Sequence, residues 1–176
     1  VQGLHLRHPK QHADWPEQPQ HHFLADEVWE NHAYGPNVAY DHGHHGNAIL
    51  SRFCIASQHN QDVTHFRFEG RGHLHCAIEV PGLALPVHCV SVHLSLFAGS
   101  RRKQLAALVE RIEAVVPANA PLIIAGDFND WKNHADALLA QRLNLQEAFA
   151  SNRGERPARS FPARLPLLRL DRIYLR

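Results

Sequence analysis

The residues best suited to chemistry are Asp127 and Asn129, which follow a short apolar stretch at residues 122–125. Pro121 and Gly126 bound that stretch, and its composition predicts a strand buried on both faces. In open α/β sheets, ligands gather at the carboxyl ends of strands, and a carboxylate followed by an amide suits a hard cation, an attacking water and a phosphate oxygen. Because Asp and Asn also favour ordinary turns, the spacing alone supports a capped turn equally well.

Histidines supply a second set of candidates. His93 ends a β-type run, where its ring can donate to a phosphate oxygen or a leaving group, although an ordinary strand-end histidine is the simpler interpretation. His42, His44 and His45 lie in a glycine-containing loop and could bind a transition metal such as zinc. The chain has 16 histidines, and chance clusters are common at that density, which weakens the metal interpretation. A better interpretation is that this loop borders a substrate pocket.

The composition predicts one soluble globular domain. A chain of 176 residues can bury a substantial core, and 18 Lys and Arg against 17 Asp and Glu give no overall electrostatic attraction to nucleic acid. No apolar run has the length of a transmembrane helix, so we expect no membrane span. Cys54, Cys76 and Cys89 lie in apolar runs, and their odd number predicts buried free thiols in a reducing, cytoplasmic compartment.

Strand and helix patterns indicate the elements that must position these residues. β-type runs occupy residues 38–40, 47–55, 63–68, 73–80, 86–94 and 167–175. The successive runs before residue 95 have no helix between them, which predicts an antiparallel meander. Helices are predicted at residues 23–33, 100–116 and 133–143. The second is the clearest, since Ser100 can cap it, Pro117 ends it and one apolar stripe runs along it.

Basic residues are concentrated in two places. Arg101, Arg102 and Lys103 stand in the first turn of the long predicted helix, where they form a solvated face or collect an anionic substrate. A loop at residues 148–162 and the residues just after it are rich in arginine, so that nucleic acid or another polyanion stays a candidate substrate. The arginines are Arg153, Arg156, Arg159 and Arg164. In the closing strand, Asp171 precedes Arg172, and a buried carboxylate there must be ion-paired or functional.

Five stretches, taken in order, resemble the endonuclease/exonuclease/phosphatase superfamily, which has the DNase-I-like fold. They are residues 46–52, residues 90–94, residues 101–105, Gly-Asp-Phe-Asn-Asp at 126–130 and Leu-Asp-Arg-Ile-Tyr at 170–174. The resemblance implies an α/β (α+β) fold: a four-layer sandwich of two mainly antiparallel sheets flanked by helices. Residues before Asp41 lie outside it.

The resemblance also implies hydrolysis of phosphodiesters or phosphomonoesters with Mg²⁺ or Mn²⁺. By resemblance, Asp127 binds the metal and helps to activate the attacking water, Asn129 orients the phosphate, and His93 stabilises the phosphoryl oxygens. Asp171 would hold a histidine in its working tautomer, and Asn47 would contact substrate together with Asn129 and His93. The substrate class extends to nucleic acid and phospholipid headgroups, and no stable protein partner is expected.

Two elements of the family pattern are missing from these residues. The family places a metal-binding Glu near its start and a Ser-Asp-His strand at its end, and neither occurs here. The chain also contains no Met and stops at Arg176 within a predicted strand. We therefore expect a segment of a longer protein, truncated at both ends, with exposed apolar edges and little or no turnover by itself. The alternative is a non-catalytic relative that binds a phosphorylated partner in the same cleft.

Overall fold

The computed structural model describes residues 2–6, 20–40, 43–149 and 158–176, with the backbone alone for residues 2–6, 20, 21, 27 and 28. Its helices are α1 (Gln20–Val28), α2 (Ala98–Val115) and α3 (His134–Leu143). Its strands are β1 (Gln2–Leu6), β2 (Asn31–Tyr40), β3 (Gly43–Ser51), β4 (Ile55–Asp62), β5 (Gly72–Ile78), β6 (Val87–His93), β7 (Leu122–Asp127), β8 (Gln146–Glu147) and β9 (Asp171–Leu175).

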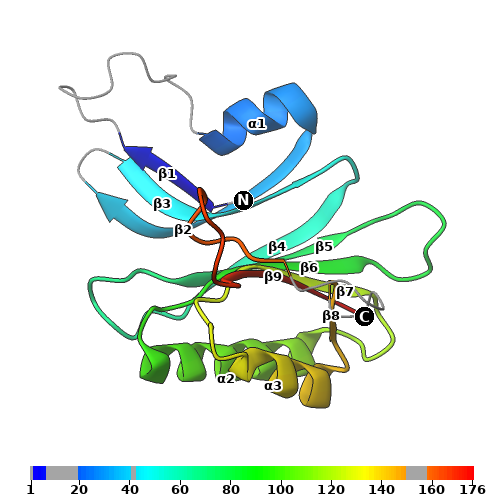
Figure 1. Cartoon of the computed structure of the whole chain (residues 1–176). Coiled ribbons are helices and arrows are strands. Elements are labelled where there is room, and N and C mark those ends of the chain that lie inside the picture. Colours follow the sequence, from blue (N-terminus) through cyan, green and yellow to red (C-terminus); the bar gives the residue numbers. More distant parts are fainter. Residues whose placement is uncertain (1, 7–19, 41–42, 150–157) are drawn as a thin grey trace.

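These strands form two sheets that face each other, with helices outside them (Figure 1). The small sheet has the order β1-β3-β2, and α1 lies on its outer side. The large sheet has the order β4-β5-β6-β7-β9-β8, and α2 and α3 cover its outer face. The predicted α/β sandwich of four layers is therefore confirmed.

The predicted meander is confirmed for β4, β5 and β6, which pair antiparallel in chain order. The chain then crosses over through α2, so that β6 and β7 pair in parallel. A parallel pair requires such a crossover, because a tight turn cannot bring two strands into the same direction. As a result, β6 and β7 both end at the same edge of the large sheet.

The main core lies between the large sheet and its helices. Val90, Val92 and Ile124 on the sheet contact the apolar stripe of α2, in which Leu108 and Ile112 are each 1% exposed. Burial of such side chains contributes about 2 kcal/mol each, which holds α2 against the ends of β6 and β7. A smaller cluster between the two sheets contains Leu74, Cys76 and Ile78 of β5 with Ala33 of β2.

The prediction of a helix at residues 23–33 is wrong at its C-terminal end. Helix α1 stops at Val28, and Asn31–Ala33 already belong to β2. Gly35 and Pro36 lie within β2, although both residue types are typical of loops. Pro36 lies where the register of β2 and β3 shifts. A proline is tolerated at such a bulge because the ladder is interrupted there.

The strand predicted at residues 63–68 is also wrong. The strand is β4, immediately before it, and residues 63–71 connect β4 to β5. β4 is the edge strand of the large sheet and is rich in polar, mostly exposed residues, so it lacks apolar alternation. The apolar Phe66 and Phe68 stand instead in the exposed connection. Similarly, β3 begins at Gly43, within the region predicted to be a loop.

Smaller corrections concern α2 and the cysteines. Ser100 does not cap α2, because the helix begins at Ala98 with Phe97 at the N-cap and no side-chain cap. All three cysteines are free, but only Cys76 is buried; Cys89 is half-buried and Cys54 is exposed. Among the described residues, no helix has the length and apolar character needed to cross a membrane.

Candidate active site

Three neighbouring strands place His93, Asp127 and Asp171 in one row at the edge of the large sheet. His93 is the register partner of Asp127 in the β6–β7 pair, and Asp127 is the register partner of Asp171 in the β7–β9 pair. His93 Nε2 lies 3.8 Å from Asp127 Oδ2, and both side chains are about one-fifth exposed or less. The candidate catalytic residues, separated by up to 78 positions in the sequence, therefore form one cluster on the face toward the small sheet.

Gly126 allows β7 to approach β6 closely just before Asp127. Its φ is +143°, and a Cβ at this position would lie 1.9 Å from the carbonyl oxygen of Val92. Any other residue would collide with the neighbouring backbone, so glycine is required for this register. The sheet thus delivers the Asp127 carboxylate beside His93 without a gap between the strands.

Asn129 fixes the turn that follows Asp127. Its backbone N–H donates to Asp127 Oδ1 at 2.8 Å, and its side-chain Nδ2 donates to the carbonyl oxygen of Leu94 at 2.8 Å. Asn129 has φ +47°, a left-handed conformation that asparagine tolerates better than most residues. The turn predicted from the sequence is therefore present, and it leaves Asp127 Oδ2 directed toward His93. Contact of Asn129 with a phosphate stays a prediction.

The small sheet contributes His45 and Asn47 from β3. The rings of His45 and His93 lie edge to face with their centroids 5.6 Å apart. Asn47 is fully buried, and its Nδ2 donates to the carbonyl oxygens of Gly72 at 2.8 Å and Ser91 at 3.2 Å. Its Oδ1 has no hydrogen-bond partner among the residues that the structure describes, which leaves a buried acceptor between the two sheets.

Arg71 is a site residue that the sequence analysis missed. Its side chain is 12% exposed and pairs with Glu69 at 3.4 Å. Its positive charge contributes to lowering the pKa of His45 and of His93, and it opposes the rise in the pKa of Asp127. Arg71 lies between Gly70 and Gly72 in a connection without periodicity, so only the folded structure indicates its position.

The environment keeps His93 neutral and makes Asp127 more basic. Burial, followed by the charges of Arg71 and His45, lowers the pKa of His93 to about 3. Burial is also the largest influence on Asp127 and raises its pKa; the N–H of Asn129 acts against this rise, Asp171 adds to it, and Arg71 opposes it. At neutral pH, the imidazole of His93 therefore has one N–H donor and no charge.

Asp127 and Asp171 offer the type of oxygen ligand that magnesium takes. Mg²⁺ in proteins is held by one or two carboxylates, with waters and substrate phosphates completing the octahedron. Two carboxylates at neighbouring register positions repel each other, and a divalent cation between them would relieve that repulsion. No group of three or more acidic, histidine or cysteine side chains in the described part of the chain is arranged to hold a metal by itself.

The zinc hypothesis for the histidine loop finds little support in β3. His44 and His45 are consecutive strand residues, so their side chains point to opposite faces. His44 Nδ1 lies 2.6 Å from the hydroxyl oxygen of Tyr34, whereas His45 packs against His93. His42 lies outside the described residues. The interpretation that this segment borders the site agrees with the position of His45.

The expectation of a buried carboxylate at Asp171 is wrong, because its neighbour Arg172 is the buried residue. Asp171 is exposed, whereas the Arg172 side chain is fully buried and pairs with Asp136 at 2.8 Å and Asp130 at 3.7 Å. Alternation along β9 explains the difference: Arg172 and Tyr174 point toward the helices, and Asp171 points toward the small sheet. Asp130 Oδ2 also accepts a hydrogen bond from the Ala135 N–H in the first turn of α3 at 2.8 Å.

The predicted basic residues do not converge on the site as a group. Arg101 is 5% exposed, and its guanidinium donates to the carbonyl oxygens of Ser95 and Leu96. Arg102 and Lys103 are exposed on α2, as a solvated face requires. Arg159 and Arg164 are exposed as well, and Arg153 and Arg156 lie outside the described residues.

Comparison with known proteins identifies the family. The model of the Endonuclease/Exonuclease/phosphatase family matches residues 5–176. The chain belongs to this family. It is 44% identical over 176 residues to the uncharacterized protein YbhP of Escherichia coli (strain K12), an alignment that covers 100% of this chain and 69% of that protein. YbhP of Shigella flexneri matches with the same identity and coverage.

Several solved structures share the fold. The human Nocturnin catalytic domain with bound sulfate superposes with a TM-score of 0.67 at 18% identity, over 89% of this chain and 63% of that one. D. rerio TDP2 complexed with single-strand DNA product gives 0.61 at 18% identity, over 88% and 65%. The mannosyl-6-phosphatase Bt3783 of Bacteroides thetaiotaomicron gives 0.61 at 17% identity, over 88% and 67%. This chain therefore spans about two thirds of each neighbour.

Proposed function

We propose that the polypeptide containing these residues is a divalent-metal-dependent hydrolase of phosphate esters. The observation that carries the proposal is the row of Asp171, Asp127 and His93, with the charge of Arg71 acting on the same groups. A pair of carboxylates, a neutral imidazole and a fixed guanidinium supply a cation site, a proton acceptor, a hydrogen-bond donor and an anion-binding group. These are the parts that phosphoester hydrolysis needs.

Each residue has a role that follows from its environment. Asp127 and Asp171 would hold Mg²⁺ or Mn²⁺, which supplies Lewis-acid polarisation of the phosphoryl group when bound. Asp127 would also accept the proton of an attacking water. His93, neutral because its pKa is lowered, would donate its N–H to a phosphoryl oxygen. Arg71 would attract the anionic substrate through charge-assisted hydrogen bonds.

The structural neighbours support the chemical class without selecting one substrate. One of them contains a sulfate, one contains a single-strand DNA product, and one is a mannosyl-6-phosphatase. The first two contain an oxyanion or a phosphodiester, and the third is named for a phosphomonoester substrate. We therefore propose a phosphodiester or phosphomonoester as substrate.

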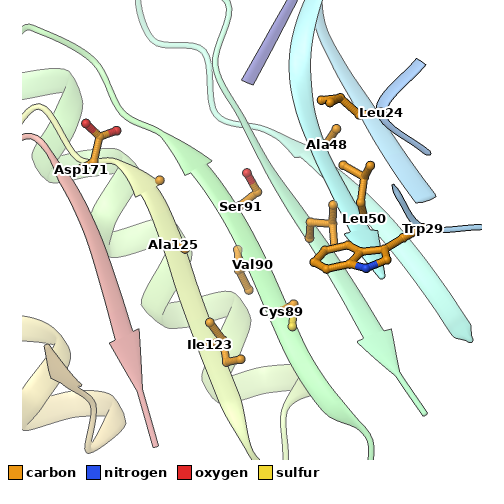
Figure 2. Close-up of a pocket in the computed structure, with 12 residues that line it drawn as sticks. Leu24, Trp29, Ala48, Leu50, Cys89, Val90, Ser91, Ile123, Ala125 and Asp171 are labelled. Atoms are coloured by element: carbon orange, nitrogen blue, oxygen red, sulfur yellow. The ribbon is translucent and has the colours of Figure 1, made fainter. Parts of the chain in front are cut away.

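A cavity between the two sheets affects how the protein must be assayed. Its volume is about 700 Å³, and Trp29, Ala48 and Leu50 lie across it from Cys89, Ile123 and Ala125 of the large sheet (Figure 2). Asp171 stands at one end of it, so the cavity reaches the candidate active site. We propose that residues outside these 176 cover this apolar space in the complete polypeptide, and that the 176-residue chain alone turns over little substrate.

The test is hydrolysis of bis-(p-nitrophenyl) phosphate and of p-nitrophenyl phosphate by the complete polypeptide, with Mg²⁺, with Mn²⁺ and with EDTA. Release that requires metal supports the proposal, and the preferred ester shows whether a diester or a monoester is cleaved. Absence of release under every condition, combined with tight binding of inorganic phosphate, would favour the non-catalytic phosphate-binding relative instead.

A further inference from the structure

Large apolar side chains gather on the loops around the candidate active site. We call this surface the aromatic rim; it consists of Phe66, Phe68, Leu96, Phe97 and Trp131, whose exposed fractions range from 41% to 72%. They lie in three connections: β4 to β5, β6 to α2, and β7 to α3. All three connections leave the large sheet at the edge where His93 and Asp127 lie, on the left in Figure 1.

The rings of the rim contact one another. Phe66 lies edge to face with Phe68 at a centroid distance of 5.5 Å and with Phe97 at 5.1 Å. Two connections that are far apart in the sequence are thereby joined at their outer surface. Glu69 joins them beneath the rings, because its carboxylate accepts hydrogen bonds from the Ser95 hydroxyl and from the Leu96 N–H.

Buried polar side chains of α2 hold the rim in place. Gln104 is 1% exposed; its Oε1 accepts a hydrogen bond from the Ser95 N–H at 2.8 Å, and its Nε2 donates to the carbonyl oxygen of Val63 at 3.0 Å. Arg101 donates to the Ser95 carbonyl at 2.9 Å, and its guanidinium carbon lies 5.4 Å from the centroid of the Trp131 ring. The rim is therefore a supported surface, in which apolar rings are kept exposed by polar groups below them.

Cationic side chains border the rim. Arg67 lies between two of its phenylalanines, Arg102 and Lys103 stand in the first turns of α2, and Lys132 follows Trp131; all four are exposed. The nearby acid Glu69 is only partly exposed and is already paired with Arg71. An apolar surface with a cationic border complements the surface of a lipid layer, where acyl chains lie beneath anionic headgroups.

We propose that the aromatic rim binds the surface of an anionic lipid bilayer. Its apolar side chains insert between the lipids, and its bordering cations contact the anionic headgroups. Single-stranded nucleic acid fits less well, because bases stack on open ring faces. The guanidinium of Arg67 lies 4.5 Å from the Phe68 centroid, and each edge-to-face pair uses one face of a ring. Leu96, at 55% exposed, has no ring at all.

The experiment is flotation of the complete polypeptide with vesicles in EDTA, so that binding is measured without any hydrolysis. Vesicles of phosphatidylcholine are compared with vesicles that also contain phosphatidylglycerol. The variant F68S/F97S removes two exposed rings, and Leu83→Ser is the matched control, because Leu83 is 51% exposed in the turn at the opposite edge of the sheet. Circular dichroism establishes that each variant is folded.

We expect binding to the phosphatidylglycerol vesicles, weakened about tenfold or more in F68S/F97S because of the lost apolar burial and unchanged in Leu83→Ser. Arg67→Gln should weaken binding to the vesicles that contain phosphatidylglycerol and leave binding to phosphatidylcholine vesicles unchanged. As a measurement on the unaltered protein, lipids brominated near the headgroup should quench tryptophan fluorescence, and this quenching should disappear in Trp131→Phe. The proposal would be overturned if the unaltered protein failed to bind these vesicles or if F68S/F97S bound them equally well. It would also be overturned if F68S/F97S lost binding to an oligonucleotide while its binding to vesicles stayed intact.

Discussion

His93 and Asp127 end two parallel strands at the same register position, with His93 Nε2 3.8 Å from Asp127 Oδ2. This distance is too long for a hydrogen bond. Since burial lowers the pKa of His93 to about 3, the pair is a neutral ring beside a carboxylate and not an ion pair at neutral pH. Both groups are therefore available to a phosphate ester and its attacking water.

Arg71→Gln should lower kcat/KM by about 10- to 100-fold, because one charge-assisted contact to an anionic substrate contributes a few kcal/mol at most. The loss should appear chiefly in KM and in the affinity for inorganic phosphate as a competitive inhibitor. Removing the positive charge should also raise the pKa of His93, since Arg71 is one of the causes that lower it.

The matched control is Arg52→Gln. Arg52 is exposed and directly follows the C-terminal end of β3, whereas His45 lies near the N-terminal end of that strand. Steady-state kinetics of the complete polypeptide compare the two variants. Equal effects of both substitutions would show that the charge of Arg71 has no special part in binding.

Asn129→Ala should reduce turnover by about tenfold or more and destabilise the fold by about 1–3 kcal/mol, through the lost hydrogen bond to Leu94 and the cost of alanine at positive φ. Turnover falls because the turn that orients Asp127 is loosened. Asn144→Ala is the control, since Asn144 has φ +53° at the end of α3 and its side chain is exposed. Thermal unfolding and kinetics separate the two effects; full turnover in Asn129→Ala would contradict the orienting role.

His73 should make the protein less stable in acid. It is 2% exposed, neither ring nitrogen has a hydrogen-bond partner in the described part of the chain, and burial lowers its pKa from 6.5 to about 4. Between pH 6.5 and pH 4 the unfolded chain binds a proton at this histidine and the folded chain does not. The stability is therefore present above pH 6.5 and is lost as the pH falls toward 4, by on the order of 3 kcal/mol in total.

Denaturant unfolding at several pH values measures this dependence. His73→Leu should reduce the slope of unfolding free energy against pH by about 1 kcal/mol per pH unit between the two pKa values. His65→Gln, which changes an exposed histidine in the β4–β5 connection, should leave the slope unaltered. An unchanged slope in His73→Leu would show that another group causes the loss of stability.

The sequence predicts that Asp127 and Asn129 lie where a strand ends, and the structure agrees, since β7 ends at Asp127. This is predictable because a strand end is a local property of the chain. The long helix is predictable for a similar reason, since its apolar stripe is continuous from Leu105 to Ile112. β4 is not predictable in this way, because an edge strand with exposed polar residues has no apolar alternation.

Contributions from separate segments also escape prediction. Arg71 comes close to His93 and Asp127 through the pairing of β5, β6 and β7 within the large sheet, and to His45 only when the two sheets face each other. The same holds for the aromatic rim, where Phe66 and Phe97 meet although 31 positions separate them in the chain. Tertiary packing alone brings such residues together, and no short sequence window contains the information.

The most direct test of the proposed chemistry is Asp127→Asn in the complete polypeptide, assayed on bis-(p-nitrophenyl) phosphate with saturating Mn²⁺. The substitution keeps the shape of the side chain and an oxygen that accepts the Asn129 N–H, but removes the charge and the proton acceptor. We predict a fall in kcat of about a thousandfold or more, with weaker Mn²⁺ binding and an unaltered circular dichroism spectrum. Metal-dependent turnover that survives in Asp127→Asn would contradict the assignment of Asp127 to the centre of the active site.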